Sequence, residues 1–174
     1  MDFFCKYLLN RKIKRRLNLQ RRQRKFQNLK GINTVLVLFD VEDCADVEDF
    51  VKILKLSGKR VLAVAFKYRK IANYPFDIEF IVTEKDINFT KSETVSAIET
   101  MLEGNIFDLV VDMVRNDNPL MKYVLVSANA LLKVGIHKSN LHIHDILILS
   151  PSGEENTSVK EFGKQIIYYL STIS

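Results

Sequence analysis

The densest group of carboxylates follows the first apolar run of the sequence. Six acids stand between positions 40 and 49: Asp40, Glu42, Asp43, Asp46, Glu48 and Asp49. Asp40 ends the first expected strand, and Asp112 lies near the end of the fourth. In a doubly wound sheet these strands are neighbours at the edge where ligands usually bind, so the two carboxylates would suit Mg²⁺ or acid–base catalysis. They are the catalytic candidates.

The alternative interpretation of these acids is structural. Strand-end aspartates commonly cap the following helix, and acids in a first helical turn interact favourably with the helix dipole. The spacing of the acids forces no third ligand, so this interpretation needs fewer assumptions. Whether the chain is an enzyme is left open.

The same turn argues against nucleotide binding. Nucleotide-binding Rossmann domains place glycines there, because the backbone must approach a pyrophosphate closely. This turn has no glycine, and its carboxylates would repel the anion. No Walker A sequence occurs elsewhere, so we expect no nucleotide and no other cofactor.

Three histidines, His137, His142 and His144, are the remaining titratable candidates. A strand through this region would place His142 and His144 on one face, a geometry that suits a metal or a proton-transfer site. Zinc needs further ligands, and only His137 and Asp145 are near in sequence. A polar, solvent-exposed entry to a strand explains them more simply, so we predict no metal site.

Positive charge is concentrated at the start of the chain. Residues 1–30 hold 11 basic residues and one acid, a net charge of +10, whereas the 15 basic and 20 acidic residues that follow leave −5. Such an asymmetry is typical of an arm that contacts an anionic partner. The candidate binding residues are Arg11, Lys12, Lys14, Arg15, Arg16, Arg21, Arg22, Arg24 and Lys25.

Three uses of this arm remain open. It binds nucleic acid through lysine–phosphate and arginine–phosphate contacts. It lies on an anionic membrane, with the apolar residues of its first turns inserted. Or it docks on an acidic protein surface, either that of its own domain or that of a second copy in a homo-oligomer. In the last case a stripe of Leu9, Ile13 and Leu17 would be buried.

The periodicity of the sequence predicts the elements that position these residues. Residues 1–30 contain good helix formers and no Gly or Pro, which indicates a helix. Buried strands are expected at 34–39, 60–66, 76–82, 107–113, 132–136 and 145–149. Amphipathic helices are expected at 46–56, from a capping box at Thr90 to Gly104, from Asn118 to about Ala130, and from Ser158 to Ile173.

Strands alternating with helices indicate an α/β fold with a mainly parallel sheet, and we predict a doubly wound, Rossmann-like arrangement. The expected organisation is a basic helical arm at 1–30 and one α/β domain at 31–174. The first residues do not form a signal peptide, and no apolar run approaches a membrane span. We therefore expect a cytoplasmic protein, with peripheral membrane contact left open.

Four segments carry a family resemblance: NTVLVLFD, FDLVVDM, NPLMKYVLVSANALLKVGIH and HDILILS. With the basic start, they resemble a group of short, uncharacterised bacterial proteins described as a domain of unknown function, which implies no activity. The strand–helix–strand segment 107–136 is also similar to the N-terminal half of heptosyltransferase-type glycosyltransferases. This chain lacks the length for the second domain that holds the sugar nucleotide in those enzymes, so none of their catalytic residues is transferred.

Overall fold

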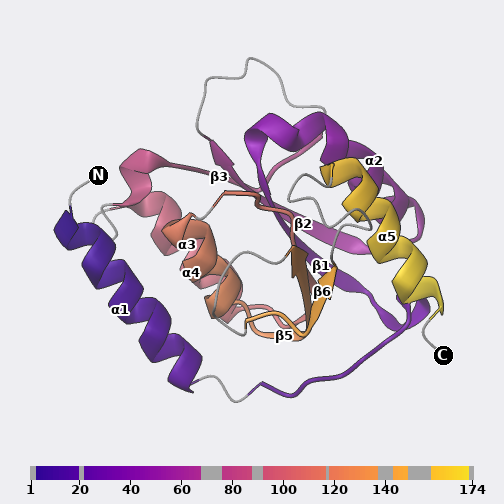
Figure 1. Ribbon diagram of the computed structural model, residues 1–174, viewed down its shortest axis with the longest axis horizontal. Coiled ribbons are helices and arrows are strands. Elements are labelled where there is room, and N and C mark those ends of the chain that lie inside the picture. The colour runs from indigo at the N-terminus through magenta and orange to yellow at the C-terminus, as the bar shows by residue number, and fades with distance from the viewer. Residues whose placement is uncertain are drawn as a thin grey trace.

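A single parallel sheet forms the centre of the molecule (Figure 1). The structure is a computed structural model that describes residues 3–19, 22–67, 76–87, 92–116, 118–136, 143–148 and 158–172. In this part of the chain six strands pair in the order β3-β2-β1-β4-β5-β6, and all neighbours are parallel. The strands are β1 (Thr34–Asp40), β2 (Arg60–Lys67), β3 (Phe80–Thr83), β4 (Phe107–Asp112), β5 (Ala130–Ile136) and β6 (Ile146–Ile148).

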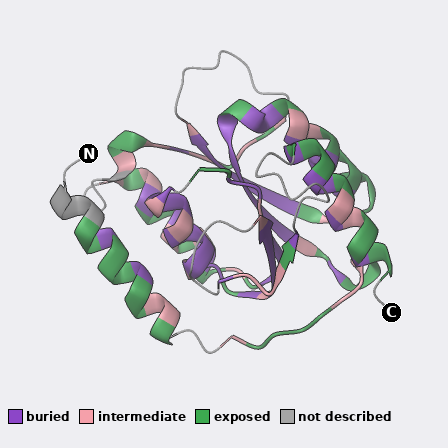
Figure 2. Cartoon of the chain, in the orientation of Figure 1, coloured by how far each residue is buried: buried purple, intermediate pink, exposed green. Residues whose placement is uncertain are grey.

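The strand order reverses direction between β1 and β4, which defines a doubly wound, Rossmann-like sheet. The predicted fold class is thus confirmed. The central strands are apolar on both faces because each face is covered by helices. Figure 2 shows this pattern as buried residues along the middle of the molecule and exposed ones on the outer helix faces.

Helices cover both faces of the sheet (Figure 1). The helices are α1 (Phe3–Leu19), α2 (Cys44–Leu56), α3 (Glu93–Glu103), α4 (Pro119–Ser127) and α5 (Val159–Thr172), with 3-10 turns η1 (Leu29–Gly31), η2 (Val41–Asp43) and η3 (Glu84–Ile87). α2 and α5 pack together on one face. α3 and α4 cover the other, and α1 lies against α4.

Local capping chemistry determines several helix starts. Asn118 caps α4, its side chain accepting hydrogen bonds from the amides of Leu120 and Met121, and Pro119 is the first helical residue. The Ser158 hydroxyl accepts from the Glu161 amide at the start of α5. The predicted capping residue of α3 was wrong. Ser92 is the cap, accepting from the amide of Val95, whereas Thr90 lies outside the described residues.

Several predicted boundaries were also wrong. β3 begins at Phe80 rather than at residue 76, and α2 begins at Cys44, two residues early. α4 ends at Ser127, and Ala130 already belongs to β5. The physical reason is that the Ala130 backbone pairs with Phe107 of β4, so the sheet competes successfully for residues with good helix propensity.

The largest difference from expectation concerns the arm. Its helix ends at Leu19, and residues 22–28 form an extended, non-helical segment that we call the tether. The tether lies along the amino end of β5, where the Lys25 amide donates to the Leu131 carbonyl over 3.1 Å. These tertiary contacts outweigh the helix propensity of the arginines and glutamines in this part of the chain.

Candidate functional site

The two candidate carboxylates lie on neighbouring strands at the same edge of the sheet. β1 pairs with β4, and Asp112 is in register with Leu38, two residues before Asp40. The expectation that their strands are neighbours at the switch point is confirmed. The two side chains nevertheless have separate partners, so the chemistry of each must be considered by itself.

Asp40 is buried and holds the loop that follows β4. Its Oδ2 accepts from the Arg115 amide and from Asn116 Nδ2, both over 3.2 Å. The buried carboxylate of Asp43 pairs with the guanidinium of Arg115, with 3.0 Å between Oδ2 and Nε. Asp40 and Asp43 thus bind the chain's own loop. The predicted capping of the following helix by strand-end aspartates was wrong here, because neither side chain makes a cap hydrogen bond.

Asp112 pairs instead with His144. Asp112 Oδ2 lies 3.0 Å from His144 Nε2, and its Oδ1 accepts from the Val114 amide over 3.1 Å. Both side chains are largely buried. An imidazole hydrogen-bonded to a carboxylate is an arrangement that suits proton transfer, because the carboxylate holds the ring in a fixed orientation. We call Asp112 and His144 the dyad.

Gly135 makes room for the dyad. It is the register partner of Asp112 on β5, and a Cβ atom there would lie 2.3 Å from His144 Nε2 and 2.5 Å from Cδ2. Only glycine therefore lets the imidazole lie against the sheet. Sequence reasoning missed this pairing, because 32 positions separate the partners and only the lone glycine in an apolar strand hints at a close approach.

Gly135→Ala is expected to displace the His144 ring and to break its contact with Asp112. The loss of a partly buried hydrogen bond to a charged group should lower the free energy of unfolding by about 1–3 kcal/mol. Urea denaturation measures it. Gly104→Ala is the matched control, because its Cβ would meet the nearest atom at an ordinary 3.4 Å. Equal stability of the two variants would contradict the steric role of Gly135.

The other histidines lie outside the described residues. His137 and His142 are among them, so the geometry of the predicted His142–His144 pair is not described. Over the residues that the structure does describe, no three His, Cys, Asp or Glu side chains are placed to hold a metal ion. Cys44 is buried, and burial raises the pKa of its thiol to about 11, which keeps the thiol protonated at neutral pH.

The apolar stripe of α1 faces α4. Leu9 and Ile13 are fully buried in the core on this face of the sheet, and Leu17 packs partly against it. This burial turns the opposite side of the helix outward. Its exposed basic residues are Arg11, Lys12, Lys14 and Arg15. The arm therefore packs on its own domain while presenting a basic outer face.

Arg16 differs from these residues, because it faces the body. Its guanidinium lies 5.4 Å from the ring centroid of Tyr123 and 3.8 Å from the Glu99 carboxylate. The Tyr123 hydroxyl donates to Glu99, and burial together with this hydrogen bond raises the pKa of Tyr123 above its ordinary value. Arg16 thus anchors α1 to α3 and α4.

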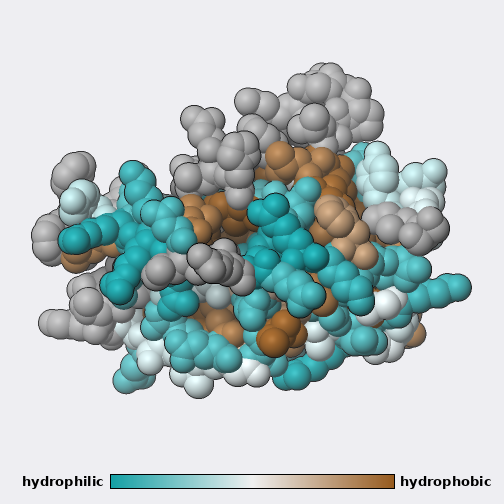
Figure 3. Space-filling view, turned by 90° about the horizontal axis from the view of Figure 1, so that it is seen from below, coloured by the Kyte–Doolittle hydropathy of each residue, from teal (hydrophilic) through white to brown (hydrophobic). Residues whose placement is uncertain are grey.

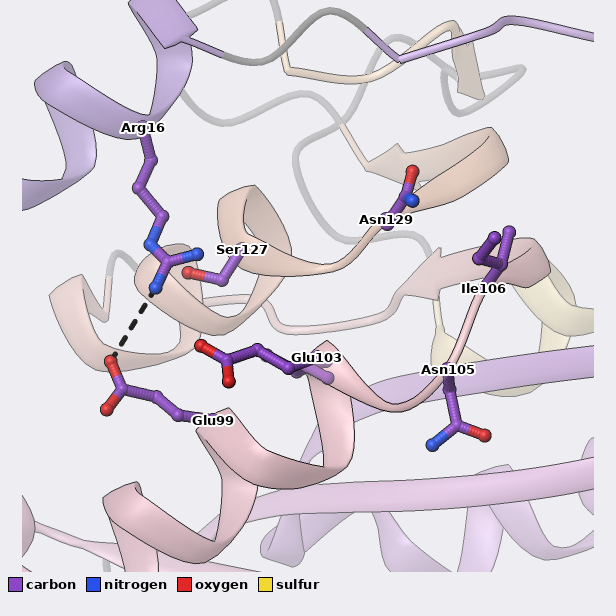
Figure 4. A pocket seen from close by; sticks show the side chains of 8 residues that line it. Arg16, Glu99, Glu103, Asn105, Ile106, Ser127 and Asn129 are labelled. Carbon is purple, nitrogen blue, oxygen red and sulfur yellow. Dashed lines mark ion pairs between the residues drawn. The ribbon is translucent and has the colours of Figure 1, made fainter.

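A hollow of about 330 Å³ adjoins this anchor (Figure 4). It opens between α1, the end of α3 and the turn before β5, at the amino edge of the sheet, and is thus remote from the edge that carries Asp40 and Asp112. Its lining is mostly polar: Arg16, Glu99, Leu102, Glu103, Asn105, Ile106, Ser127 and Asn129. Figure 4 shows Arg16 extending from α1 toward Glu99.

Arg22 anchors the tether. Its Nη2 lies 2.5 Å from Asp145 Oδ1, its Nη1 donates to the Ala130 carbonyl, and its side chain is 6% exposed. Arg24 contacts the same carboxylate over 3.2 Å but is 66% exposed. Arg22 is therefore a structural residue, whereas Arg24 and Lys25 reach solvent. Arg21 lies outside the described residues.

A fully buried lysine lies beside this anchor. The Lys133 amide donates to Asp145 Oδ2 over 2.8 Å, and its Nζ donates to the Leu125 carbonyl over 2.6 Å. Leu125 lies in the last turn of α4, where helix carbonyls generally lack intrahelical partners, and this turn contains no basic residue that could bind them. Burial is the main cause that lowers the pKa of Lys133 to about 7, and the nearby charge of Arg22 adds to it.

A comparison with known protein families identifies the family of this chain. The profile of a family described as "Family of unknown function (DUF6913)" matches residues 6–173. The chain belongs to DUF6913. The predicted resemblance to a domain of unknown function is thus confirmed, while the bacterial origin and the heptosyltransferase likeness stay predictions. No curated protein and no solved structure matches this DUF6913 chain. Among its described helices, none combines the length and the apolarity that crossing a bilayer requires.

Proposed function

We propose that this DUF6913 chain is a non-enzymatic binding module that engages an anionic polymer through the outer face of α1 and the adjoining tether. The observation that carries the proposal is the burial of Leu9 and Ile13, which directs Arg11, Lys14 and Arg15 toward solvent. Because the helix is already docked on the domain, its backbone does not have to be ordered when an anionic partner binds, which lowers the entropic cost of association.

Nucleic acid fits this surface better than a membrane. An amphipathic helix binds a bilayer by burying its apolar face, and binding strength grows with the apolar area inserted. In α1 the stripe of Leu9 and Ile13 is already buried against α4, which leaves only Tyr7 and Leu8 exposed among its apolar side chains whose burial is described. Its outer face is basic, which suits phosphates spaced along a strand, and such contacts need no apolar insertion.

The experiment is a salt-titrated binding assay with the full chain. The variant Arg11→Gln/Lys14→Gln/Arg15→Gln removes three exposed charges from one helical face. We expect its affinity for an RNA oligonucleotide to fall about tenfold or more at low salt, with a shallower dependence on salt concentration. Fluorescence anisotropy gives both quantities.

The matched control is Lys55→Gln/Arg60→Gln/Lys164→Gln, which removes three exposed charges from other surfaces. It should bind RNA like the parent protein. If both triple variants lost the same RNA affinity, the loss would follow from net charge alone, and a specific basic binding face would be refuted. Preferential binding to phosphatidylserine vesicles would instead show that the anionic partner is a membrane surface and not a nucleic acid.

A second candidate function is acid–base catalysis by the dyad. The specific observation is the 3.0 Å contact between His144 and Asp112 at the carboxyl edge of the sheet. Asp40 has no part in this version, because Arg115 and Asn116 bind it. Gly135→Ala distinguishes the two candidates, since it disturbs the dyad and leaves the basic face intact. Loss of RNA binding in that folded variant would speak against the proposed function.

A further inference from the structure

The tether carries one aromatic side chain, and this side chain remains in solvent. Phe26 is 60% exposed and follows Gln23, Arg24 and Lys25, all of which are exposed as well. A single exposed phenylalanine is not unusual in itself. Phe26, however, follows two exposed cations in an extended segment, and this combination of a ring and positive charges suggests a binding role.

The backbone that carries Phe26 is fixed on both sides. Before it, the Lys25 amide is bonded to Leu131, and Arg22 is held by Asp145. After it, the Asn28 side chain accepts from the Gly31 amide and caps η1. The ring thus projects from a pinned, extended segment, so ordering it on binding a ligand costs little.

We infer that Phe26 is a stacking platform for a base of single-stranded nucleic acid, with Arg24 and Lys25 facing the adjacent phosphates. This inference rests on the proposed function and deepens it. Proteins that bind single strands combine a cationic track for the backbone with aromatic rings on which bases stack. A duplex offers phosphates but keeps its bases inside, so the ring adds nothing to duplex binding.

The surroundings of Phe26 support a strand rather than a lipid surface. Figure 3 looks at the molecule from the side along which the tether runs in Figure 1, and hydrophilic residues cover much of that side. The tether is extended rather than helical, and Phe26 is the only apolar residue among positions 22–28. One ring provides little of the apolar area that interfacial binding needs.

The chain contains no tryptophan, which makes a direct test possible. In Phe26→Trp the introduced indole is the only one, and stacking on a base should quench its fluorescence. In Phe26→Leu the apolar bulk remains but the ring is lost. We expect Phe26→Leu to bind a single-stranded oligonucleotide about fivefold or more weakly. Its affinity for polyphosphate, a polyanion without bases, should be unchanged.

Tyr168→Leu is the matched control, because it removes an equally exposed ring from α5 and should alter neither affinity. If Phe26→Leu binds the oligonucleotide like the parent protein, or the indole is not quenched, the inference is overturned while salt-dependent binding still supports the proposed function. If neither polyanion binds at about 50 mM salt, the proposed function fails and the inference with it. A blue shift with anionic vesicles, without quenching by oligonucleotides, would also overturn it.

Discussion

Asp145→Asn is expected to lower the free energy of unfolding by about 3–5 kcal/mol. The substitution keeps the shape of the side chain but leaves the guanidinium of Arg22, 6% exposed, without its counter-charge. Because a buried cation has lost most of its hydration, removing the carboxylate leaves that cost uncompensated. Urea denaturation gives the loss. Faster tryptic cleavage after Arg24 or Lys25 in the folded protein would locate it in the tether.

Two variants separate the buried pair from a general charge effect. Arg24→Gln removes the other cation that contacts Asp145, but this guanidinium is 66% exposed and should matter by less than about 1 kcal/mol. The double variant Arg22→Gln/Asp145→Asn removes both buried charges. Its loss in the free energy of unfolding should be smaller than the sum of the losses of the two single variants. Additive losses would contradict a direct Arg22–Asp145 interaction.

The arm illustrates both the reach and the limit of sequence reasoning. The positions Leu9, Ile13 and Leu17 predict a stripe that is buried if the arm docks, and the structure buries it against α4. Nothing in a run of arginines distinguishes Arg22 from its neighbours, because its role depends on a carboxylate 123 positions away. Helix propensity therefore extended the predicted helix through a segment whose conformation is determined by tertiary contacts.

The candidate site, too, was predictable from the sequence only in part. Strand periodicity placed Asp40 and Asp112 at the ends of their strands, and the predicted doubly wound order made those strands neighbours. The partners of the two carboxylates were not predictable from the sequence. Asp40 is bound by the loop after β4, and Asp112 by a histidine that precedes β6. Both pairings join residues that are far apart in the sequence, for which local patterns carry no signal.

Lys133 combines complete burial with a titratable ammonium group. In the sequence it is one polar residue in an apolar strand, and in the structure its ammonium group has no access to solvent. Burial and the charge of Arg22 lower its pKa from 10.5 to about 7, while Asp145 opposes the shift. Since the unfolded chain keeps the ordinary pKa, it binds a proton more readily than the folded protein does. Stability is therefore lost as the pH falls from about 10.5 to about 7.

Lys133→Met should remove this pH dependence. At pH 6 the variant is expected to be more stable than the parent protein, because no ammonium group has to be buried. Above pH 7 the free energy of unfolding of the parent protein rises by up to about 1.4 kcal/mol per pH unit, because Lys133 loses its proton in the folded state. The neutral amine still donates to the Leu125 carbonyl. The stability difference between the variant and the parent protein should thus shrink by about 2 kcal/mol between pH 7 and pH 9, as urea denaturation at each pH would show.

The control is Lys55→Met, at an exposed position of α2, for which the stability difference from the parent protein should stay constant with pH. A constant difference for Lys133→Met would show that Lys133 does not titrate in this range.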